Sequence, residues 1–118
     1  MDADSVVVVT NQPKRARQTK TQNTLRRQPP YHVILLNDDD HTYEYVIEML
    51  QKLFGHPPWK GFVMAQEVDS SGRVIVDTTT RERAELKRDQ IHSYGPDHRL
   101  PRSAGSMSAV IEPAVSES

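Results

Sequence analysis

The stretch from Tyr31 to Phe54 constrains the fold more than any other part of the sequence. A short apolar run, residues 32–36, is bounded by prolines on one side and by an Asn-Asp cluster on the other, which predicts a strand. After the cluster NDDDH, residues 37–41, apolar residues recur at helical spacing, with Thr42 as the N-cap and Gly55 as the end of the helix. The folded part therefore begins with a strand and a helix, separated by concentrated negative charge.

Four further elements follow along the chain. They are a helix from Pro58 to about Val68, a turn at 69–72 leading into a strand at 73–80, a helix from a capping box at Thr79-x-x-Glu82 to about Tyr94, and a strand at 106–112. The third helix is mostly polar, so we expect it on the outside with surface free for a partner. The order β-α-α-β-α-β predicts an α+β fold, a small three-stranded antiparallel sheet with three helices packed on one face.

Composition divides the chain into three segments. Residues 1–30 hold six bases against two acids, and from Thr10 onward they are poor in apolar residues, so we expect a flexible, disordered basic arm. Residues 31–113 form one domain, because a chain of this length has no room for a second core, and residues 114–118 form a tail. The arm either contacts an acidic partner or nucleic acid, or is a solvated leader.

Several classes of protein are excluded by what the sequence lacks. There is no cysteine, which rules out disulfides, thiolate metal sites and thiol nucleophiles. The early apolar run, residues 6–9, is shorter than the roughly 7–15 residues of a signal sequence, and no run approaches the roughly 20 of a membrane span. We therefore expect a cytoplasmic protein without membrane contact, and a monomer.

The NDDDH cluster has three interpretations. Asp39 and Asp40 can stabilise the positive end of the helix dipole. The acids, His41 and Asp69 can ligate a metal, although the glycine spacing of a calcium loop and an HExxH motif are both missing, and His41 itself is expected to face solvent. Alternatively, an amide and a carboxylate can bind an amine at the rim of an apolar pocket. The side chains available as pocket walls are Leu36, Tyr43, Val46 and Val68.

The segment YHVILLNDDDHTYEYVIEMLQKLF resembles the opening of ClpS, the adaptor that recognises N-degrons, destabilising N-terminal residues, for the Clp protease. The similarity continues through Gly72, the strand RVIVDTT and a helix start that reads Thr80-x-Glu82-x-Ala84-Glu85-x-Lys87. It is strong from Tyr31 to about Tyr94 and returns near Met107, whereas residues 95–105 form a longer loop than the family pattern predicts.

The resemblance implies a role for individual residues. Asn37 and Asp38 hold the free α-amino group of a substrate whose first residue is bulky and apolar. Tyr43 stands at the gate position, usually methionine, and Val46 and Met107 are among the pocket walls. Glu82 and Lys87 match the face that docks on the N-terminal domain of a Clp-type AAA+ ATPase, while the arm helps to hand substrate over.

Two positions depart from the family pattern. The amine-binding histidine is Asp69 here, and a pocket-lining methionine is Ala65. Asp69 keeps an acceptor for the amine and adds negative charge, or is only a turn residue before Ser-Ser-Gly. Alanine widens the pocket while tyrosine at the gate narrows its mouth, so the preferred N-terminal residue is left open.

The resulting hypothesis is a non-enzymatic adaptor without a cofactor, which delivers N-degron substrates to a Clp ATPase-protease. One alternative binds the ATPase and modulates it without reading N-termini. A second is a small metal-dependent hydrolase centred on Asp38, His41 and Asp69. A third is a nucleic-acid binder that uses the basic arm, against which the sequence has no interleaving of aromatic and basic residues.

Overall fold

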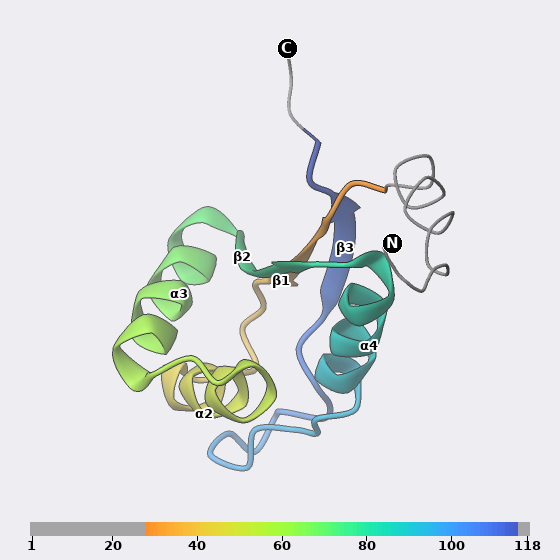
Figure 1. Ribbon diagram of the computed structural model, residues 1–118. Helices are drawn as coiled ribbons and strands as arrows, with labels where there is room; N and C mark the ends of the chain where they lie inside the picture. Colours follow the sequence, from red (N-terminus) through yellow and green to blue (C-terminus); the bar gives the residue numbers. More distant parts are fainter. Residues whose placement is uncertain (1–27, 116–118) are drawn as a thin grey trace, which may run out of the picture.

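A computed structural model describes residues 28–115 of the chain (Figure 1). Its elements are β1 (Tyr31–Leu36), α2 (Tyr43–Phe54), α3 (Pro58–Ser71), β2 (Arg73–Thr79), α4 (Arg81–His92) and β3 (Ala109–Pro113). The predicted order β-α-α-β-α-β is thereby confirmed. The predicted arm lies outside the described residues up to residue 27, and so does the end of the predicted tail from residue 116.

The sheet has the order β2-β1-β3, and β1 pairs antiparallel with both neighbours. Val33 and Leu35 belong to the main hydrophobic core. Ile34, between them, lies on the opposite face beside its partners Ile75 and Val110, which are 45% and 37% exposed. The helices therefore cover one face of the sheet, as predicted, and the other face is partly exposed at Ile75 and Val110, with Ile34 buried between them.

The three helices cover the core face in two groups. In Figure 1, α2 and α3 lie side by side and α4 stands apart from them, and α4 contacts all three strands. At Gly61 in α3, a Cβ would come within 3.2 Å of the Ile47 Cα, so glycine allows α3 to approach α2 closely. Met49 and Leu50 of α2 and Ile91 of α4 are completely buried between these layers.

Three boundaries differ from the predictions. Helix α3 continues to Ser71, past the predicted end at Val68, and the left-handed conformation of Gly72 (φ 88°) caps it. The predicted turn at 69–72 is therefore wrong, because Asp69 belongs to the last helical turn. Strand β3 begins at Ala109, later than predicted, and α4 ends at His92, before Tyr94. The predicted polar character of α4 holds, since its buried side chains are Ala84 and Ile91.

The N-cap of α4 is Thr80, and the predicted capping box that starts at Thr79 is wrong. The Thr80 hydroxyl accepts a hydrogen bond from the Arg83 N–H at 3.2 Å, whereas Thr79 ends β2 and pairs with Tyr31. Strand pairing continues to Thr79, so the first residue free to leave the sheet is the next threonine.

Replacing Thr80 by alanine is expected to lower the free energy of unfolding by about 1 kcal/mol, because an orphan N–H at the helix start loses its acceptor. Chemical denaturation followed by circular dichroism measures the change. Thr80→Ser, which keeps the hydroxyl, is the matched control and should recover most of the loss. An equal loss in both variants would contradict the capping role.

Between residues 28 and 115, no helix combines the length and the apolar composition that crossing a membrane requires.

Candidate functional site

A small cavity of about 40 Å³ lies where the end of β1, the start of α2 and the last turns of α3 meet. Its lining residues are Asn37, Asp38, His41, Thr42, Tyr43, Val46, Ala65, Val68, Asp69 and Met107. Eight of the nine residues proposed for amine and side-chain binding are among them. The exception is Leu36, which is not part of the lining.

Backbone hydrogen bonds position the rim of this cavity. The Leu36 N–H donates to the Ser108 carbonyl at 2.9 Å, and the Asn37 N–H donates to the Gly72 carbonyl at 3.0 Å. The end of β1 is thus fixed between the segment before β3 and the end of α3. This explains how residues that are far apart in sequence come to share one cavity.

Asp38 is held by its own turn and by His41. Its Oδ1 accepts hydrogen bonds from the Asp40 N–H at 2.9 Å and from His41 Nδ1 at 2.8 Å. The Asp38 side chain is nevertheless 33% exposed. A carboxylate that is oriented and still reachable by solvent can accept further hydrogen bonds from a cationic ligand.

His41 is a site residue whose surroundings the sequence did not predict. Its side chain is only 3% exposed, so the expectation that it faces solvent is wrong. Nε2 lies 2.7 Å from the Gly105 carbonyl oxygen, and the ring lies 4.5 Å from the Tyr45 ring between centroids. The imidazole is held at both nitrogens and therefore orients Asp38. The feature of the sequence that could have indicated the contact between His41 and Asp38 is their spacing of three residues.

The loop 95–105 wraps around the start of α2, and the buried Asp97 anchors it. The N–H and hydroxyl of Thr42 donate to Asp97 Oδ2 at 2.7 and 2.8 Å, and the Arg99 N–H and guanidinium donate to Oδ1 at 3.0 and 3.2 Å. Burial raises the pKa of the Asp97 carboxyl, but the hydrogen bonds from Thr42 and Arg99 outweigh it and lower the pKa to about 2. The sequence did not single out this residue.

Two arginines of the same loop neutralise acids around the cluster. Arg99 pairs with Glu48 of α2 at 2.8 Å, and Arg102 bonds the Asp39 carbonyl and the Asp40 carboxylate at 3.1 and 3.2 Å. Asp40 thus has an ionic partner in addition to its place near the helix start. Of the three consecutive acids, Asp38 is the one that lines the cavity.

Tyr43 and Asp69 also line the cavity, and their side chains contact each other. The Tyr43 hydroxyl donates to Asp69 Oδ2 at 2.8 Å, and the Tyr43 ring meets the edge of Phe62 with centroids 5.8 Å apart. The hydrogen bond to Asp69 raises the pKa of the Tyr43 phenol, with smaller contributions from burial and from the charge of Asp69.

The metal-hydrolase alternative has no support in this geometry. Within residues 28–115, no group of three or more His, Asp or Glu side chains is arranged to hold a metal ion. Of the three proposed ligands, Asp69 bonds Tyr43 and His41 bonds Asp38 and Gly105.

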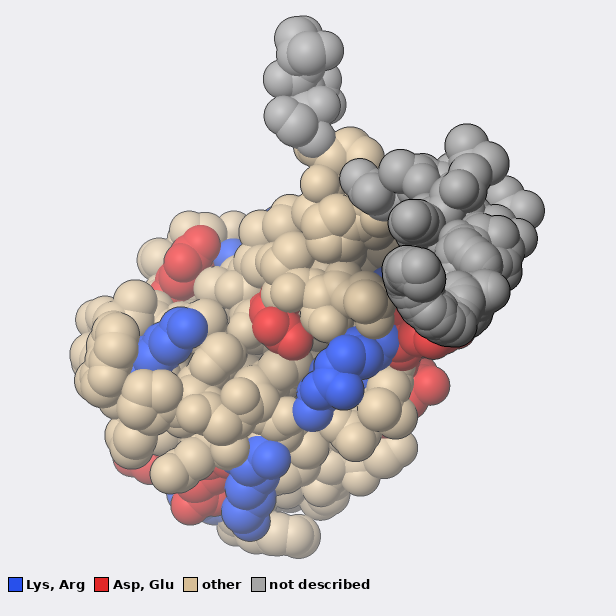
Figure 2. All heavy atoms as spheres, viewed as in Figure 1, with Lys and Arg blue, Asp and Glu red and all other residues tan. Residues whose placement is uncertain are grey.

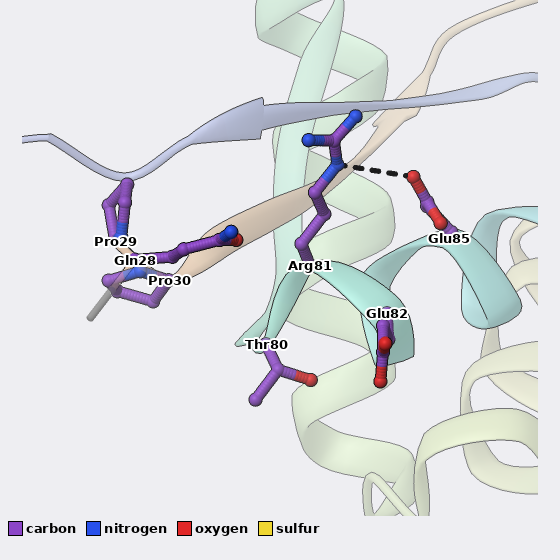
Figure 3. A pocket seen from close by; sticks show the side chains of 7 residues that line it. All are labelled: Gln28, Pro29, Pro30, Thr80, Arg81, Glu82 and Glu85. Carbon is purple, nitrogen blue, oxygen red and sulfur yellow. Dashed lines mark hydrogen bonds and ion pairs between the residues drawn. The ribbon is translucent and has the colours of Figure 1, made fainter. Parts of the chain in front are cut away.

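Glu82 and Lys87, the predicted ATPase-docking pair, lie on α4 away from the cavity. Glu82 borders an open groove of about 680 Å³ between the start of α4 and residues 28–30. Arg81 and Glu85, which Figure 3 shows paired, line the groove from the same helix, with 3.3 Å between Nε and Oε2. Lys87 is half-buried, and its ammonium donates to the Leu53 carbonyl and lies 5.3 Å from the centre of the Phe54 ring. Glu82 is exposed, whereas Lys87 is held against the end of α2.

The charge on the described part of the molecule is mixed. On the face seen in Figure 2, Lys and Arg side chains lie next to Asp and Glu side chains and form no extended basic patch. The face seen in Figure 2 therefore gives the nucleic-acid alternative no support.

Comparison with known proteins agrees with this geometry. A model of the family described as ATP-dependent Clp protease adaptor protein ClpS matches residues 26–103. The chain is 35% identical over 83 residues to the ATP-dependent Clp protease adapter protein ClpS of Ruegeria sp. (strain TM1040), covering 70% of this chain and 74% of that one. It is 33% identical over 75 residues to the corresponding adapter of Hydrogenovibrio crunogenus, covering 62% and 72%.

A solved structure shares the fold. It is Agrobacterium tumefaciens ClpS2 bound to L-phenylalaninamide, with a TM-score of 0.63, 26% identity, and coverage of 74% of this chain and 99% of that chain. Sequence, architecture and family model lead to one conclusion: this chain belongs to the ClpS family of Clp protease adaptors.

Proposed function

We propose that this adaptor captures proteins through a free N-terminal amine and a bulky apolar first side chain, and passes them to a Clp-type ATPase. The observation that carries the proposal is a single cavity whose lining combines Asn37, Asp38 and Asp69 with Val46 and other apolar residues. Such a cavity matches a ligand that combines a cation with an apolar group.

The amine is assigned to the polar lining residues of the cavity. A peptide α-amino group has a reference pKa of about 7.7–8.0, so at neutral pH it is largely an ammonium. Asn37 offers its amide oxygen and Asp38 a carboxylate that His41 already orients. Charge-assisted hydrogen bonds of this kind are about twice as strong as neutral ones.

The side chain of the substrate's first residue is assigned to the apolar lining residues of the cavity. Val46, Ala65, Val68 and Met107 are each at most 3% exposed, so they form a rigid floor and walls. Leu36, which does not line the cavity, is left out of this pocket. The similar Agrobacterium protein was solved with L-phenylalaninamide, which has a free amine beside an apolar side chain, and this supports the assignment.

Delivery is assigned to other parts of the chain. We assign residues 31–113 to the adaptor domain, residues 114–118 to a tail and the basic segment 1–30 to substrate transfer. The contact with the ATPase is assigned to α4, at Glu82. Lys87 contributes to that contact when its hydrogen bond to the Leu53 carbonyl is released. Binding and transfer involve no bond-making step, so the role requires neither catalytic residues nor a cofactor.

The expected result of a direct test is that fluorescent peptides beginning with Leu, Phe, Tyr or Trp bind only with a free N-terminus. N-acetylation removes the charge and two donors, so affinity should fall roughly 10- to 100-fold. Fluorescence anisotropy at neutral pH measures both forms of each peptide. Equal binding of free and acetylated forms would exclude amine recognition, while the ranking of the free peptides reports side-chain preference.

A second candidate function is modulation of the ATPase without reading N-termini. The small size of the cavity favours it, because about 40 Å³ has room for only a few water molecules. A chain with this function would bind the N-terminal domain of the ATPase and none of the four free peptides.

A further inference from the structure

The hydrogen bond between Tyr43 and Asp69 spans the two helices that form the cavity. Tyr43 is the first residue of α2 and Asp69 lies in the last turn of α3, and both line the cavity. Their side chains meet at 2.8 Å, while the Tyr43 ring rests against Phe62, about two helical turns before Asp69 on α3. We call this contact the Tyr43–Asp69 latch.

With the latch closed, the cavity is too small for the ligand proposed above. A volume of about 40 Å³ has room for only a few water molecules, so a leucine or phenylalanine side chain does not fit in this arrangement of side chains. The apolar lining residues are buried and well packed. Tyr43 is instead partly exposed, and its hydroxyl is fixed by the bond to Asp69. Tyr43 is the one large apolar lining side chain that is not buried, so it can move without unpacking the core.

The acceptor that holds Tyr43 is also an acceptor that an amine can use. Asp69 lines the same cavity as Asn37 and Asp38. Both partners are charged when a carboxylate binds an ammonium, whereas only the acceptor is charged in its bond to the Tyr43 phenol, so the ammonium adds a direct charge–charge attraction. An arriving ammonium therefore competes with the Tyr43 hydroxyl for Asp69, and the apolar group attached to it competes for the space that the ring leaves.

We propose that Tyr43 and Asp69 are a specificity-determining pair: the latch keeps the pocket closed, and the ammonium of the ligand opens it by taking over Asp69. The inference rests on the proposed function. Its consequence is a double requirement, because an apolar group without an amine cannot release Tyr43. The latch thus makes the pocket more selective for residues with a free N-terminal amine over internal or N-acetylated residues. It also lowers the affinity for every ligand, because each must break the Tyr43–Asp69 hydrogen bond.

Removal of the hydroxyl tests the cost of the latch. Tyr43→Phe keeps the ring against Phe62 and abolishes the hydrogen bond, so it should bind L-phenylalaninamide about twofold to tenfold more tightly than the original chain, the range of one net hydrogen bond. It should also discriminate less against N-acetyl-L-phenylalaninamide. Isothermal titration calorimetry gives both affinities. Tyr31→Phe removes a hydroxyl in β1, outside the cavity lining, and should leave them unchanged. Unchanged or weaker binding by Tyr43→Phe would overturn the proposal.

A second measurement needs no ligand. The chain has four tyrosines, and the NMR signal of the Tyr43 ring is identified by its loss in Tyr43→Phe. In the free protein this signal should shift on Asp69→Ala, and in the original chain L-phenylalaninamide should move it the same way. No shift on Asp69→Ala would show that the latch does not form, whatever the peptides do.

The two measurements also separate the latch from the proposed function. A shift on Asp69→Ala, combined with no binding of L-phenylalaninamide to either the original chain or Tyr43→Phe, would reject N-degron recognition. The same outcome would also reject the proposal that an ammonium opens the pocket.

Discussion

Replacing Asp38 by asparagine is expected to reduce the affinity for free-amine peptides roughly 10- to 100-fold. The substitution keeps the shape of the side chain and removes its charge, so the ammonium loses a charge-assisted hydrogen bond. The His41 ring also loses the carboxylate that it orients. Fluorescence anisotropy with a peptide that begins with Phe or Leu measures the loss.

Asp39→Asn is the matched control for this variant. Asp39 is the adjacent acid, its side chain is exposed and it does not line the cavity. The same change of charge at position 39 should alter affinity by less than about twofold, because exposed charges are largely screened. Similar losses in both variants would show that the cluster attracts the peptide by its total charge and that Asp38 makes no specific contact.

Replacing Asp97 by alanine is expected to lower the free energy of unfolding by about 2–3 kcal/mol. The buried carboxylate accepts four hydrogen bonds from Thr42 and Arg99, and its removal leaves the Thr42 N–H without an acceptor. For a domain of this size, such a loss corresponds to a fall in Tm of roughly 10–20 °C. Urea denaturation and thermal melting measure the two quantities.

The pH dependence of stability separates the charge of Asp97 from its packing. The folded-state pKa of about 2 lies below the ordinary value of 3.8, so the carboxylate's contribution is complete above pH 4–5 and is lost as the pH falls from 3.8 through 2. The difference in stability between the original chain and Asp97→Asn should therefore shrink by roughly 2 kcal/mol between pH 5 and pH 2. A difference that is independent of pH would contradict the assignment.

Much of the fold was predictable because it depends on local patterns. The helical spacing of apolar residues after Thr42 and the φ of 74° at Gly55 are properties of short segments, and the structure has a helix between them with both caps in place. The start of α4 was predicted wrongly because tertiary contacts decide it: strand pairing extends to Thr79 and moves the cap to Thr80. The end of α3 is set locally, since the helix runs one further turn until Gly72 caps it.

The candidate site was predictable only in part. Family resemblance singled out Asn37 and Asp38, which lie next to the end of the strand, and the roles assigned to them stay predictions. The sequence did not show that His41 would be buried against Asp38, nor that loop 95–105 would supply its second partner. A histidine among acids has the same local pattern whether it is solvated or enclosed, so burial depends on what the rest of the chain places over it.

The sequence by itself determined the class of the fold, the order of its elements and the position of the amide and carboxylate after the first strand. The tertiary structure decided which hydrogen bonds orient the amide and the carboxylate and which side chains lie around them. Asp97 reaches Thr42 across 55 residues, Gly105 reaches His41 across 64, and Tyr43 reaches Asp69 across 26. The physical reason is that periodicity, caps and turns act over a few residues, whereas these hydrogen bonds form only when packing of the core brings distant segments within about 3 Å of one another.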